Sequence, residues 1–586
     1  MQYKEGCHVT QLLRLDGVDL SLSGYDGYPA QTYDEQDAFI AIEGLIYNRS
    51  QVETRALLIE IAADYPRDDA VCKKHIAEFI ADSDREYLVL IYLKKQRAII
   101  IFNDRWGRLL ASFLVQDNVF AFSRELKFLL HWIPSVRFDR IAMAEFLIFG
   151  FNLGDKTLLE GVKRMNPAAL LEVKQSQGHT SVNEVALLPE DFTTIDSPLD
   201  RGETIMRCVQ LFRDSLRVRI QKALENGLRI VTDLSGGYDT RTVFAALCQT
   251  GEPFTVCTDG VITGDESRIA QSLADLYGKE LRVFQAFHPV DDFNVVHNIT
   301  YITDCMVNAY TAVSSYYDDL EREKSLTEPA AHFMGFGGEF IRHPYRPGRH
   351  YRNLSKMLEH DNYTYYIEAS PACAMTKLHW QDFVDNLEYE VAHFPEKDER
   401  DLVKHLYFQY YRKMVGAGED RHRLFAWTMQ PLWGQELFNF EMKKIRPRWI
   451  SYGFFIDFLK SVDRRALKVP IYRSWVRLDS SLSLIVYETE RRIRALVRDD
   501  RYLYHLSKCL GHRLIRREAE KHARLVNEVW RIYDSSTVVR EYFDQASIEK
   551  FLESVPDTLQ AFQLLTLMSY VSQVANRFPE ITSFAV

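Results

Sequence analysis

Residues 228–241 join a short apolar run, a pair of glycines and an amphipathic segment. The run predicts a buried strand, and the spacing of apolar residues over 240–249 predicts a helix. Gly236 and Gly237 lie between them, and glycine lets a backbone approach a ligand with no Cβ in the way. A helix that begins at such a turn presents unpaired N–H groups at its positive end. The stretch therefore predicts a phosphate-binding loop.

The polar side chains of this loop suit a nucleotide and its metal ion. Ser235 and Thr240 offer hydroxyl donors, and Asp239 offers a hard oxygen ligand for Mg²⁺. No Gly-Lys-Ser/Thr follows the glycines, so this is not a Walker A loop. An ordinary β–α turn is the alternative interpretation, and a full set of suitable positions between a strand and a helix argues against it.

The hexapeptide Ser-Gly-Gly-Tyr-Asp-Thr at 235–240 resembles the pyrophosphate loop of the ATP pyrophosphatases, which reads Ser-Gly-Gly-x-Asp-Ser/Thr. Those enzymes cut ATP between the α and β phosphates and adenylate a substrate oxygen, while the loop holds the leaving pyrophosphate. The resemblance implies that ATP and Mg²⁺ are the cofactors of this chain.

Composition narrows the class of protein. A chain of 586 residues is too long for one core, so two or three domains are expected. A hydrophobic share of 46% and a charged share of 26% are typical of soluble globular proteins, and the net charge of −10 argues against general nucleic-acid binding. The cysteines are scattered without a Cys-x-x-Cys pair, and no apolar run approaches a membrane span or a signal-peptide core. These features predict a cytoplasmic protein that binds neither nucleic acid nor membrane.

The N-terminal third reads as β-hairpins with helices outside them. Residues 38–47 and 87–102 are rich in β-forming side chains, whereas 51–64 and 69–83 have helical apolar spacing. This arrangement predicts a sandwich of sheets and helices.

Four segments of this region resemble asparagine synthetases. Residues 43–48 are similar to their Asn-Gly-Glu-Ile-Tyr-Asn segment, 103–108 to their Arg-Asp-Arg-Phe-Gly-Ile turn and 122–127 to their Ser-Glu-x-Lys stretch. Residues 138–167 are similar to the run that leads into their synthetase domain. The resemblance implies that residues 1–190 form a glutaminase-like domain of the N-terminal-nucleophile type, an αββα sandwich.

The glutaminase chemistry of that family is expected to be lost. Its nucleophile is an N-terminal cysteine activated by its own α-amine, whereas residue 2 of this chain is Gln2. The family's glutamine-binding Asn and Glu correspond to Glu43 and Leu45. Proteolytic removal of the residues before Cys7 would make it an N-terminal cysteine and a candidate nucleophile, but His8 follows it where the family has Gly. A structural thiol is the favoured interpretation of Cys7.

A second glycine-rich stretch lies at 331–340. Asparagine synthetase-like proteins carry Ser-Gly-x-Gly-x-Asp here, and its small residues line the nucleotide while its acid holds Mg²⁺. Gly335 and Gly337 match the two glycines, and Glu339 replaces the aspartate. The implied metal ligands are Asp239 and Glu339. The implied ATP and pyrophosphate contacts are Leu234, Ser235, Gly236, Gly237, Asp239, Thr240, Val256, Gly335 and Gly337.

The family's catalytic lysine has two candidate counterparts. Members that activate a carboxylate carry a lysine near the end of the synthetase domain, and Lys460 and Lys468 lie nearest to that place. Lys443 and Lys444 compete with them, and an exposed helix charge is the alternative for all four. Residues 427–432 fall on the family's substrate-pocket segment.

Three further features carry weaker expectations. The basic run from Arg342 to Arg352 is typical of a solvated loop, and a lip that receives an anionic substrate is the alternative. Asp265 begins a predicted helix as a cap, or closes over the nucleotide as in the family. Residues 486–586 predict a helical extension that caps the substrate pocket or offers a surface to a partner.

The sequence therefore predicts an α/β protein with three parts. A parallel-sheet ATP pyrophosphatase domain at 195–485 follows the glutaminase-like domain, and the helical extension ends the chain. The implied activity is an AMP- and pyrophosphate-forming amide ligase that adenylates a small-molecule or peptide carboxylate for attack by ammonia or a substrate amine. Lasso-peptide cyclases and β-lactam synthetases are relatives that take a substrate amine. A catalytically silent scaffold is the alternative, and the sequence leaves a homodimer open.

Overall fold

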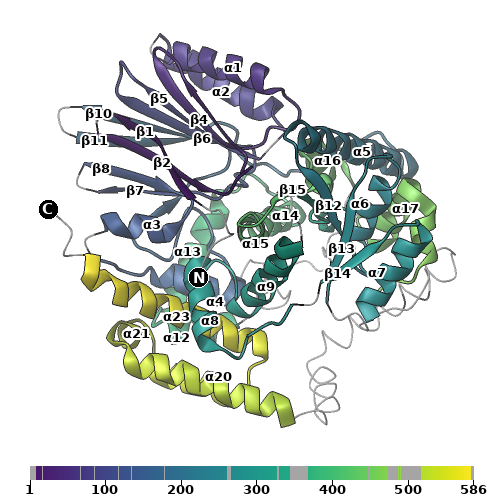
Figure 1. The fold of residues 1–586 in the computed structure, drawn as a ribbon. Helices are drawn as coiled ribbons and strands as arrows, with labels where there is room; N and C mark the ends of the chain where they lie inside the picture. The colour runs from purple at the N-terminus through teal and green to yellow at the C-terminus, as the bar shows by residue number, and fades with distance from the viewer. Residues whose placement is uncertain are drawn as a thin grey trace.

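The computed structural model describes residues 8–581 except for 16, 66, 85, 117, 134, 177–178, 261–264, 285, 326–328, 343–366, 447–448, 473–485, 487–488 and 490–515. Figure 1 shows a β-rich part at the upper left, a parallel sheet flanked by helices at the right and a helical layer below.

The N-terminal part is built on a six-stranded antiparallel sheet in the order β11-β10-β6-β5-β4-β3. Its strands are β3 (Ala30–Asp34), β4 (Ala38–Gly44), β5 (Tyr87–Leu93), β6 (Ala98–Asn103), β10 (Ala169–Ser176) and β11 (His179–Ala186). Helices α1 (Gln51–Asp64) and α2 (Asp69–Asp82) cover one face of this sheet and share an apolar core with it. A capping box between Ser50 and Glu53 begins α1.

Two smaller antiparallel sheets complete this part, a three-stranded one in the order β8-β7-β9 and the pair β1-β2. Their strands are β1 (His8–Leu15), β2 (Val18–Gly24), β7 (Ser112–Gln116), β8 (Val119–Ser123) and β9 (Lys163–Arg164). Antiparallel sheets with helices outside agree with the predicted class of fold, whereas the αββα sandwich as such stays a prediction.

A five-stranded sheet in the order β14-β13-β12-β15-β16 forms the second part, and every neighbouring pair is parallel. Its strands are β12 (Arg229–Asp233), β13 (Thr255–Asp259), β14 (Leu281–Phe284), β15 (Ala330–Phe333) and β16 (Trp427–Met429). The helices around it are α5 (Arg201–Glu225), α6 (Asp239–Leu247), α7 (Asp265–Leu276), α16 (Gln435–Lys444) and α17 (Tyr452–Asp463). The chain winds outward from β12 to β14 and then returns to the other side of β12, so its direction reverses between β12 and β15.

The helical layer joins segments that lie far apart in the sequence. Helix α23 (Thr558–Ile581) contacts α4 (Arg140–Phe149), α8 (Phe293–Ile302), α9 (Ala309–Ser325) and α20 (Arg516–Ser535), and Figure 1 shows these helices gathered below the sheets. The described helices of the predicted C-terminal extension therefore complete a core that α4, α8 and α9 share. None of the described helices has the length and apolarity that crossing a membrane requires.

The remaining helices are short or link these parts. They are α3 (Leu126–Leu129), η1 (Leu130–Trp132), α10 (Glu339–Arg342), α12 (Ala369–Met375), α13 (Trp380–Ala392), α14 (Glu399–Tyr410), η2 (Tyr411–Val415), α15 (Gly416–His422), η3 (Pro431–Trp433), η5 (Arg464–Lys468), α21 (Thr537–Tyr542) and α22 (Gln545–Glu553). Among them η2 is a single turn of π-helix, a geometry that is often found at functional sites.

Three arginines, two of them buried and one half-buried, join the N-terminal part to α15 and its surroundings. Arg108 lies 2.9 Å from Glu86 and contacts Glu419, and all three side chains are fully buried. Arg423 lies 2.5 Å from the second oxygen of Glu86 and 2.7 Å from Asp420. The third arginine, Arg124, bridges Asp420 to Glu43 on β4.

This cluster, which we call the interdomain ion network, spans segments more than 300 residues apart. Burial raises the pKa of Glu419, and the neighbouring Arg108 and Arg423 oppose the rise. The network therefore depends on each charge being paired inside a poorly solvated region.

We predict that Glu86→Gln destabilises the protein by about 3–5 kcal/mol, because it leaves Arg108 and Arg423 short of a shared buried carboxylate. Urea denaturation followed by tryptophan fluorescence measures this. The control is Glu35→Gln, which breaks an ion pair whose Arg55 side chain is 51% exposed and should cost about 0–1 kcal/mol. Equal effects of the two variants would contradict a structural role for the network.

The linker between β11 and α5, residues 187–200, is held against α14 by a charged histidine. His405 lies 3.0 Å from Glu396 and 3.1 Å from Glu190 of the linker. Burial lowers the pKa of His405, but its hydrogen bonds to Glu190 and Glu396 outweigh burial and raise the pKa to about 9. The Phe192 N–H of the same linker donates to Glu396 at 2.6 Å.

Because the folded-state pKa of His405 exceeds the unfolded value, its stabilisation is complete below about pH 6.5 and disappears as pH rises through 9. The difference in unfolding free energy between wild type and His405→Gln should therefore fall by on the order of 3 kcal/mol between pH 6 and about pH 9.5. Denaturation curves of both proteins across this range measure it. A difference that is independent of pH would show that His405 is neutral in the folded state.

Candidate active site

Two glycine-containing loops meet at the carboxyl edge of the parallel sheet. The first loop, 234–238, follows β12, and the second loop, 334–338, follows β15. β12 and β15 are the neighbours between which the winding of the chain reverses. At such a reversal, the two loops turn toward opposite faces of the sheet and leave a crevice between them. This crevice is the usual ligand site of open α/β folds.

The first loop is held in shape by its own hydroxyl groups. The Ser235 N–H donates to Thr240 Oγ1 at 3.1 Å, and the two hydroxyl oxygens lie 2.9 Å apart. The Gly237 N–H donates to Ser235 Oγ at 3.2 Å. Helix α6 begins directly afterward, and no side chain caps it. Its first turn therefore keeps the uncapped N–H groups that a phosphate site needs.

The second loop approaches the first so closely that a side chain at Gly335 or Gly338 would not fit. A Cβ on Gly335 would lie 2.5 Å from the Thr240 nitrogen and 2.7 Å from the Asp239 carbonyl carbon. A Cβ on Gly338 would collide with the Asp239 carboxylate. Gly337 has a φ of 104°, which an L side chain rarely adopts. The second loop therefore needs its glycines in order to lie this close to the first loop.

The two implied metal ligands lie beside one guanidinium group. Arg342, at the end of α10, donates to Asp239 Oδ2 and lies 3.6 Å from Glu339 Oε1. Tyr411 donates to Glu339 Oε2 at 3.1 Å and accepts from the Gly337 N–H at 2.5 Å. The structure therefore brings Asp239 and Glu339 together around a single cation, which here is an arginine.

Asp239 keeps one oxygen available for a further cation. Its Oδ1 atom is buried and makes no hydrogen bond with the described residues. Burial raises the pKa of Asp239 to about 7, while Arg342 opposes the rise and Glu339 adds to it. A buried carboxylate oxygen without a partner fits a hard metal ion, so Asp239 and Glu339 are the residues that would hold Mg²⁺.

Arg241 fastens the first loop to a segment from the end of the parallel-sheet part. Its guanidinium is fully buried and donates to three carbonyl oxygens within 466–470 and to that of Gly236, at 2.7 to 3.2 Å. The Tyr472 N–H donates to the same Gly236 carbonyl at 3.0 Å. Residues 466–472 therefore lie against the glycine turn.

The candidate lysines occupy different positions. Lys468 is exposed and belongs to the segment that lies against the first loop, whereas Lys460 is exposed on α17. Lys443 and Lys444 are half-buried in the last turn of α16. The identity of a catalytic lysine stays a prediction.

The other predicted positions divide between the site and the core. Leu234 and Val256 have buried side chains in the core between α6 and α7, so only their backbones are available at the sheet edge. The segment 427–432 forms β16 and the start of η3 and is buried throughout. Of the basic run only Arg342 lies within the described residues, and the Asp265 side chain lies outside them.

A polar cluster lies where the strands of a parallel sheet usually carry apolar side chains. Asp233, which precedes the first loop, lies 2.9 Å from His332 Nε2 and accepts from the Cys257 thiol at 3.3 Å. Arg322 lies 3.5 Å from Asp233 and 2.6 Å from Asp259. Burial raises the pKa of Asp233, but His332 and Arg322 outweigh burial and lower it well below its usual range. The cluster keeps a charged carboxylate directly beneath the loop.

Sequence reasoning did not find the roles of Arg241, Arg342 and Tyr411. Arg342 stood in the sequence as one of several basic residues, and nothing in that run distinguishes it from its neighbours. Arg241 and Tyr411 reach the loops from α6 and η2, and only the packing of these elements makes them partners.

Comparison with known families supports the N-terminal assignment. Residues 4–183 match a family described as a glutamine amidotransferase domain. No curated protein matches the chain. The N-terminal part of this protein is therefore a glutamine amidotransferase-like domain, which agrees with the predicted resemblance there.

The described structure shows how two positions of that domain are used. Glu43 accepts a hydrogen bond from Tyr28 at 2.5 Å and is paired with Arg124 of the interdomain ion network. Leu45 is 2% exposed in an apolar core. Both positions are therefore occupied by contacts within the protein.

We predict that Gly335→Ala destabilises the protein by about 1–3 kcal/mol, because its Cβ would lie 2.5 Å from backbone atoms that have no room to move aside. Gly418→Ala is the matched control, since Gly418 lies in α15 with nothing within 4 Å of the added Cβ. Alanine there should stabilise the helix by about 0.5–1 kcal/mol. Thermal unfolding of the two variants measures the difference, and a neutral Gly335→Ala would refute the close approach of the loops.

Proposed function

We propose that this protein is an ATP-dependent amide ligase that forms AMP and pyrophosphate. It adenylates a substrate carboxylate, and ammonia or an amine of the substrate then displaces AMP. The observation that carries the proposal is the meeting of the two glycine loops at the reversal point of the parallel sheet, with Asp239 and Glu339 on either side of a cation site.

The described residues offer a place for the leaving pyrophosphate of this reaction. A carboxylate oxygen of the substrate attacks the α-phosphorus of ATP, and the bond to the β-phosphate oxygen breaks. The leaving pyrophosphate would be received by the uncapped first turn of α6 and by Gly236 and Gly237. The amine then attacks the acyl carbon, AMP leaves, and the amine loses a proton to complete the amide.

The two carboxylates provide the charge that this chemistry needs. Bound Mg²⁺ would neutralise the phosphate oxygens and the charge that develops on the leaving pyrophosphate. Asp239 and Glu339 would hold that cation, and the backbone of the first loop would hold the phosphates beside it. The rate gain comes from positioning and from charge stabilisation rather than from a nucleophilic side chain.

Ammonia or a substrate amine fits the proposal better than glutamine as the nitrogen source. Glu43 and Leu45 occupy the positions of the family's glutamine-binding residues, and their side chains are engaged in an ion pair and in an apolar core. Glu43, whose carboxylate is paired with Arg124, cannot replace the asparagine that would recognise glutamine. Leu45, which is apolar, cannot replace the glutamate.

A catalytically silent binding protein is the second candidate function. Two contacts favour it: Arg342 already neutralises Asp239, and the backbone of Tyr472 lies against Gly236. A ligase requires both contacts to yield when Mg²⁺ and ATP bind, whereas a scaffold keeps them.

We predict that wild type catalyses exchange of pyrophosphate into ATP in the presence of its acid substrate, and that Asp239→Asn lowers this rate at least about 100-fold. The amide keeps the shape of the side chain but removes one of the two anions that hold the cation. A screen of candidate acids by radiolabelled pyrophosphate exchange provides the measurement, and thermal unfolding shows that the variant is folded.

Two variants of Glu339 separate a metal role from a purely structural one. Glu339→Gln should reduce exchange strongly and raise the Mg²⁺ concentration needed for half-maximal rate, whereas Glu339→Asp keeps the charge and should be affected less. Unchanged Mg²⁺ dependence in Glu339→Gln would remove this residue from the site. The scaffold would be favoured if wild type binds ATP but exchanges pyrophosphate with none of the acids, and if Asp239→Asn leaves that ATP binding unchanged.

A further inference from the structure

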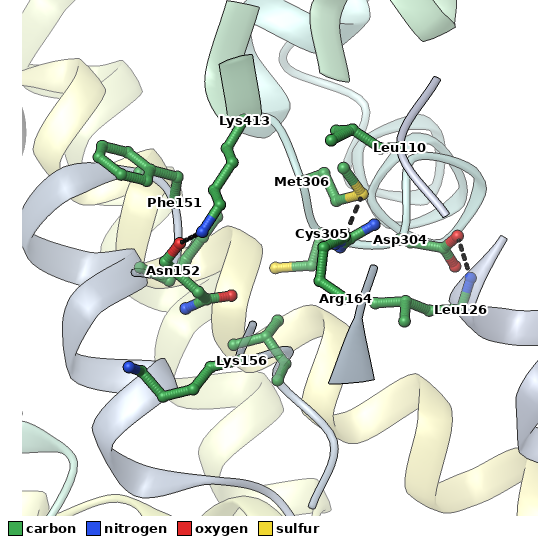
Figure 2. Close-up of a pocket in the computed structure, with 13 residues that line it drawn as sticks. Leu110, Leu126, Phe151, Asn152, Lys156, Arg164, Asp304, Cys305, Met306 and Lys413 are labelled. Atoms are coloured by element: carbon green, nitrogen blue, oxygen red, sulfur yellow. Dashed lines mark hydrogen bonds between the residues drawn. The ribbon is translucent and has the colours of Figure 1, made fainter. Parts of the chain in front are cut away.

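A cavity away from the two glycine loops is lined by more cationic than anionic side chains. It lies between α4, β9, the turn that joins α8 to α9, and the π-helical turn η2. Figure 2 shows Arg164, Lys156 and Lys413 around it, with Asp304 as the acid on its wall. Its volume is about 30 Å³. Because one water needs about 10–15 Å³ of such space, the cavity has room for about two or three waters, which is the bulk of a small organic anion.

Arg164 is the residue that this cavity leaves without a proper partner. Its side chain is 7% exposed, and its Nη1 atom is buried without a hydrogen bond. Among the described residues, Nη2 has only the Met306 sulfur as an acceptor, at 3.5 Å. No carboxylate in the described part of the chain lies within 4 Å of this guanidinium. Folded proteins rarely bury a charge in this way without an ion or a ligand to pair it.

The acid on the cavity wall is already used elsewhere. The Asp304 carboxylate accepts hydrogen bonds from the Leu126 N–H at 2.8 Å and the Lys127 N–H at 3.0 Å. These bonds hold the beginning of α3, and they leave Asp304 directed away from Arg164 (Figure 2). The positive charge of Arg164 is therefore not neutralised by direct contact with Asp304.

The two lysines differ in how well their charges are balanced. Lys156 is paired with Glu390 and lies 3.4 Å from Glu145. The acceptors of Lys413 in the described part of the chain are uncharged carbonyl oxygens, those of Asn152 at 2.7 Å and Gly154 at 2.5 Å. Burial, with the nearby Arg412 and Lys156, lowers the pKa of Lys413 to about 7, against the opposing effect of Glu145 and Glu390. The cavity is therefore short of negative charge.

We propose that this cavity binds a small monocarboxylate of the size of formate or acetate, held by Arg164. The guanidinium presents two N–H groups in a planar fork that matches a carboxylate. The rest of the wall is largely apolar and includes Leu110, Phe146, Phe151 and Leu158, which suits a hydrogen or methyl substituent. This inference stands on the cavity alone and is independent of the proposed ligase activity.

The test measures anion-dependent stability of the full-length protein. Thermal unfolding is recorded in sodium gluconate, a carboxylate too large for the cavity, while formate, acetate, propionate or chloride replaces it at constant ionic strength. Formate and acetate should raise the midpoint with a dependence that saturates in the millimolar range, and calorimetric titration should give one site per chain. A shift that grows without saturation, or saturable stabilisation by chloride alone, would overturn the proposal.

Variants of Arg164 separate this site from a general salt effect. Arg164→Met should raise the midpoint in gluconate, because it removes a buried unpaired charge, and should abolish the acetate response. Lys163→Met is the matched control, since Lys163 is 61% exposed on the same strand and should keep the wild-type response. Arg164→Lys keeps the charge without the fork, and its acetate affinity should be at least about tenfold weaker.

The outcomes remain decisive if one variant folds poorly. Arg164→Lys and wild type alone show by calorimetry whether acetate binding depends on the guanidinium. Equal acetate binding by these two proteins, or an acetate response retained in Arg164→Met, would assign the anion to another place and refute the cavity as its site.

Discussion

Each buried charge in the interdomain ion network requires the others, and this requirement fixes how the N-terminal sheet sits on the rest of the protein. Arg108 pairs with Glu86 from its own part of the chain and with Glu419 from α15, and Arg423 pairs with the same two acids, so both buried acids are shared between the two parts. Taking such groups from water costs several kcal/mol per ion, and only well-aligned partners offset that cost. The domains are thus held in one relative position by charge pairing as well as by apolar contact.

The same network reaches the candidate active site through one tryptophan. Arg108 donates to Gln430 at 2.8 Å and lies 3.8 Å above the Trp433 ring. Trp433 packs so closely against Gly337 that a Cβ there would lie 2.8 Å from the tryptophan Cβ. The position of the second glycine loop, and with it that of Glu339, therefore depends on ion pairs formed with the amidotransferase-like domain. The amidotransferase-like domain therefore has a structural role that does not require glutamine hydrolysis.

The π-helical turn η2 connects three regions that the sequence keeps apart. Tyr411 contacts Glu339 and Gly337, Arg412 donates to the Met165 carbonyl at 2.9 Å, and Lys413 faces the cavity beside Arg164. Three consecutive side chains of one turn thus touch the cation site, the turn between β9 and β10, and the cavity.

Local sequence determined the elements around the first loop because their signals are short-range. The apolar run, the glycine pair and the following helical spacing predict β12, the turn and α6, and the structure confirms these three elements within one to two residues. Capping residues likewise mark the beginnings of α1 and α5. Such boundaries follow from backbone hydrogen bonding, which depends on residues within one or two turns.

Tertiary structure alone decided which distant groups share a site. β14, β15 and β16 are four, four and three residues long, too short for their apolar pattern to distinguish them, and only parallel pairing makes them strands. The pairing of Arg342 with Asp239, the burial of Arg164 and the interdomain ion network all join residues more than 100 positions apart. No local pattern encodes such pairs, because the free energy of a buried charge depends on what the completed fold places around it.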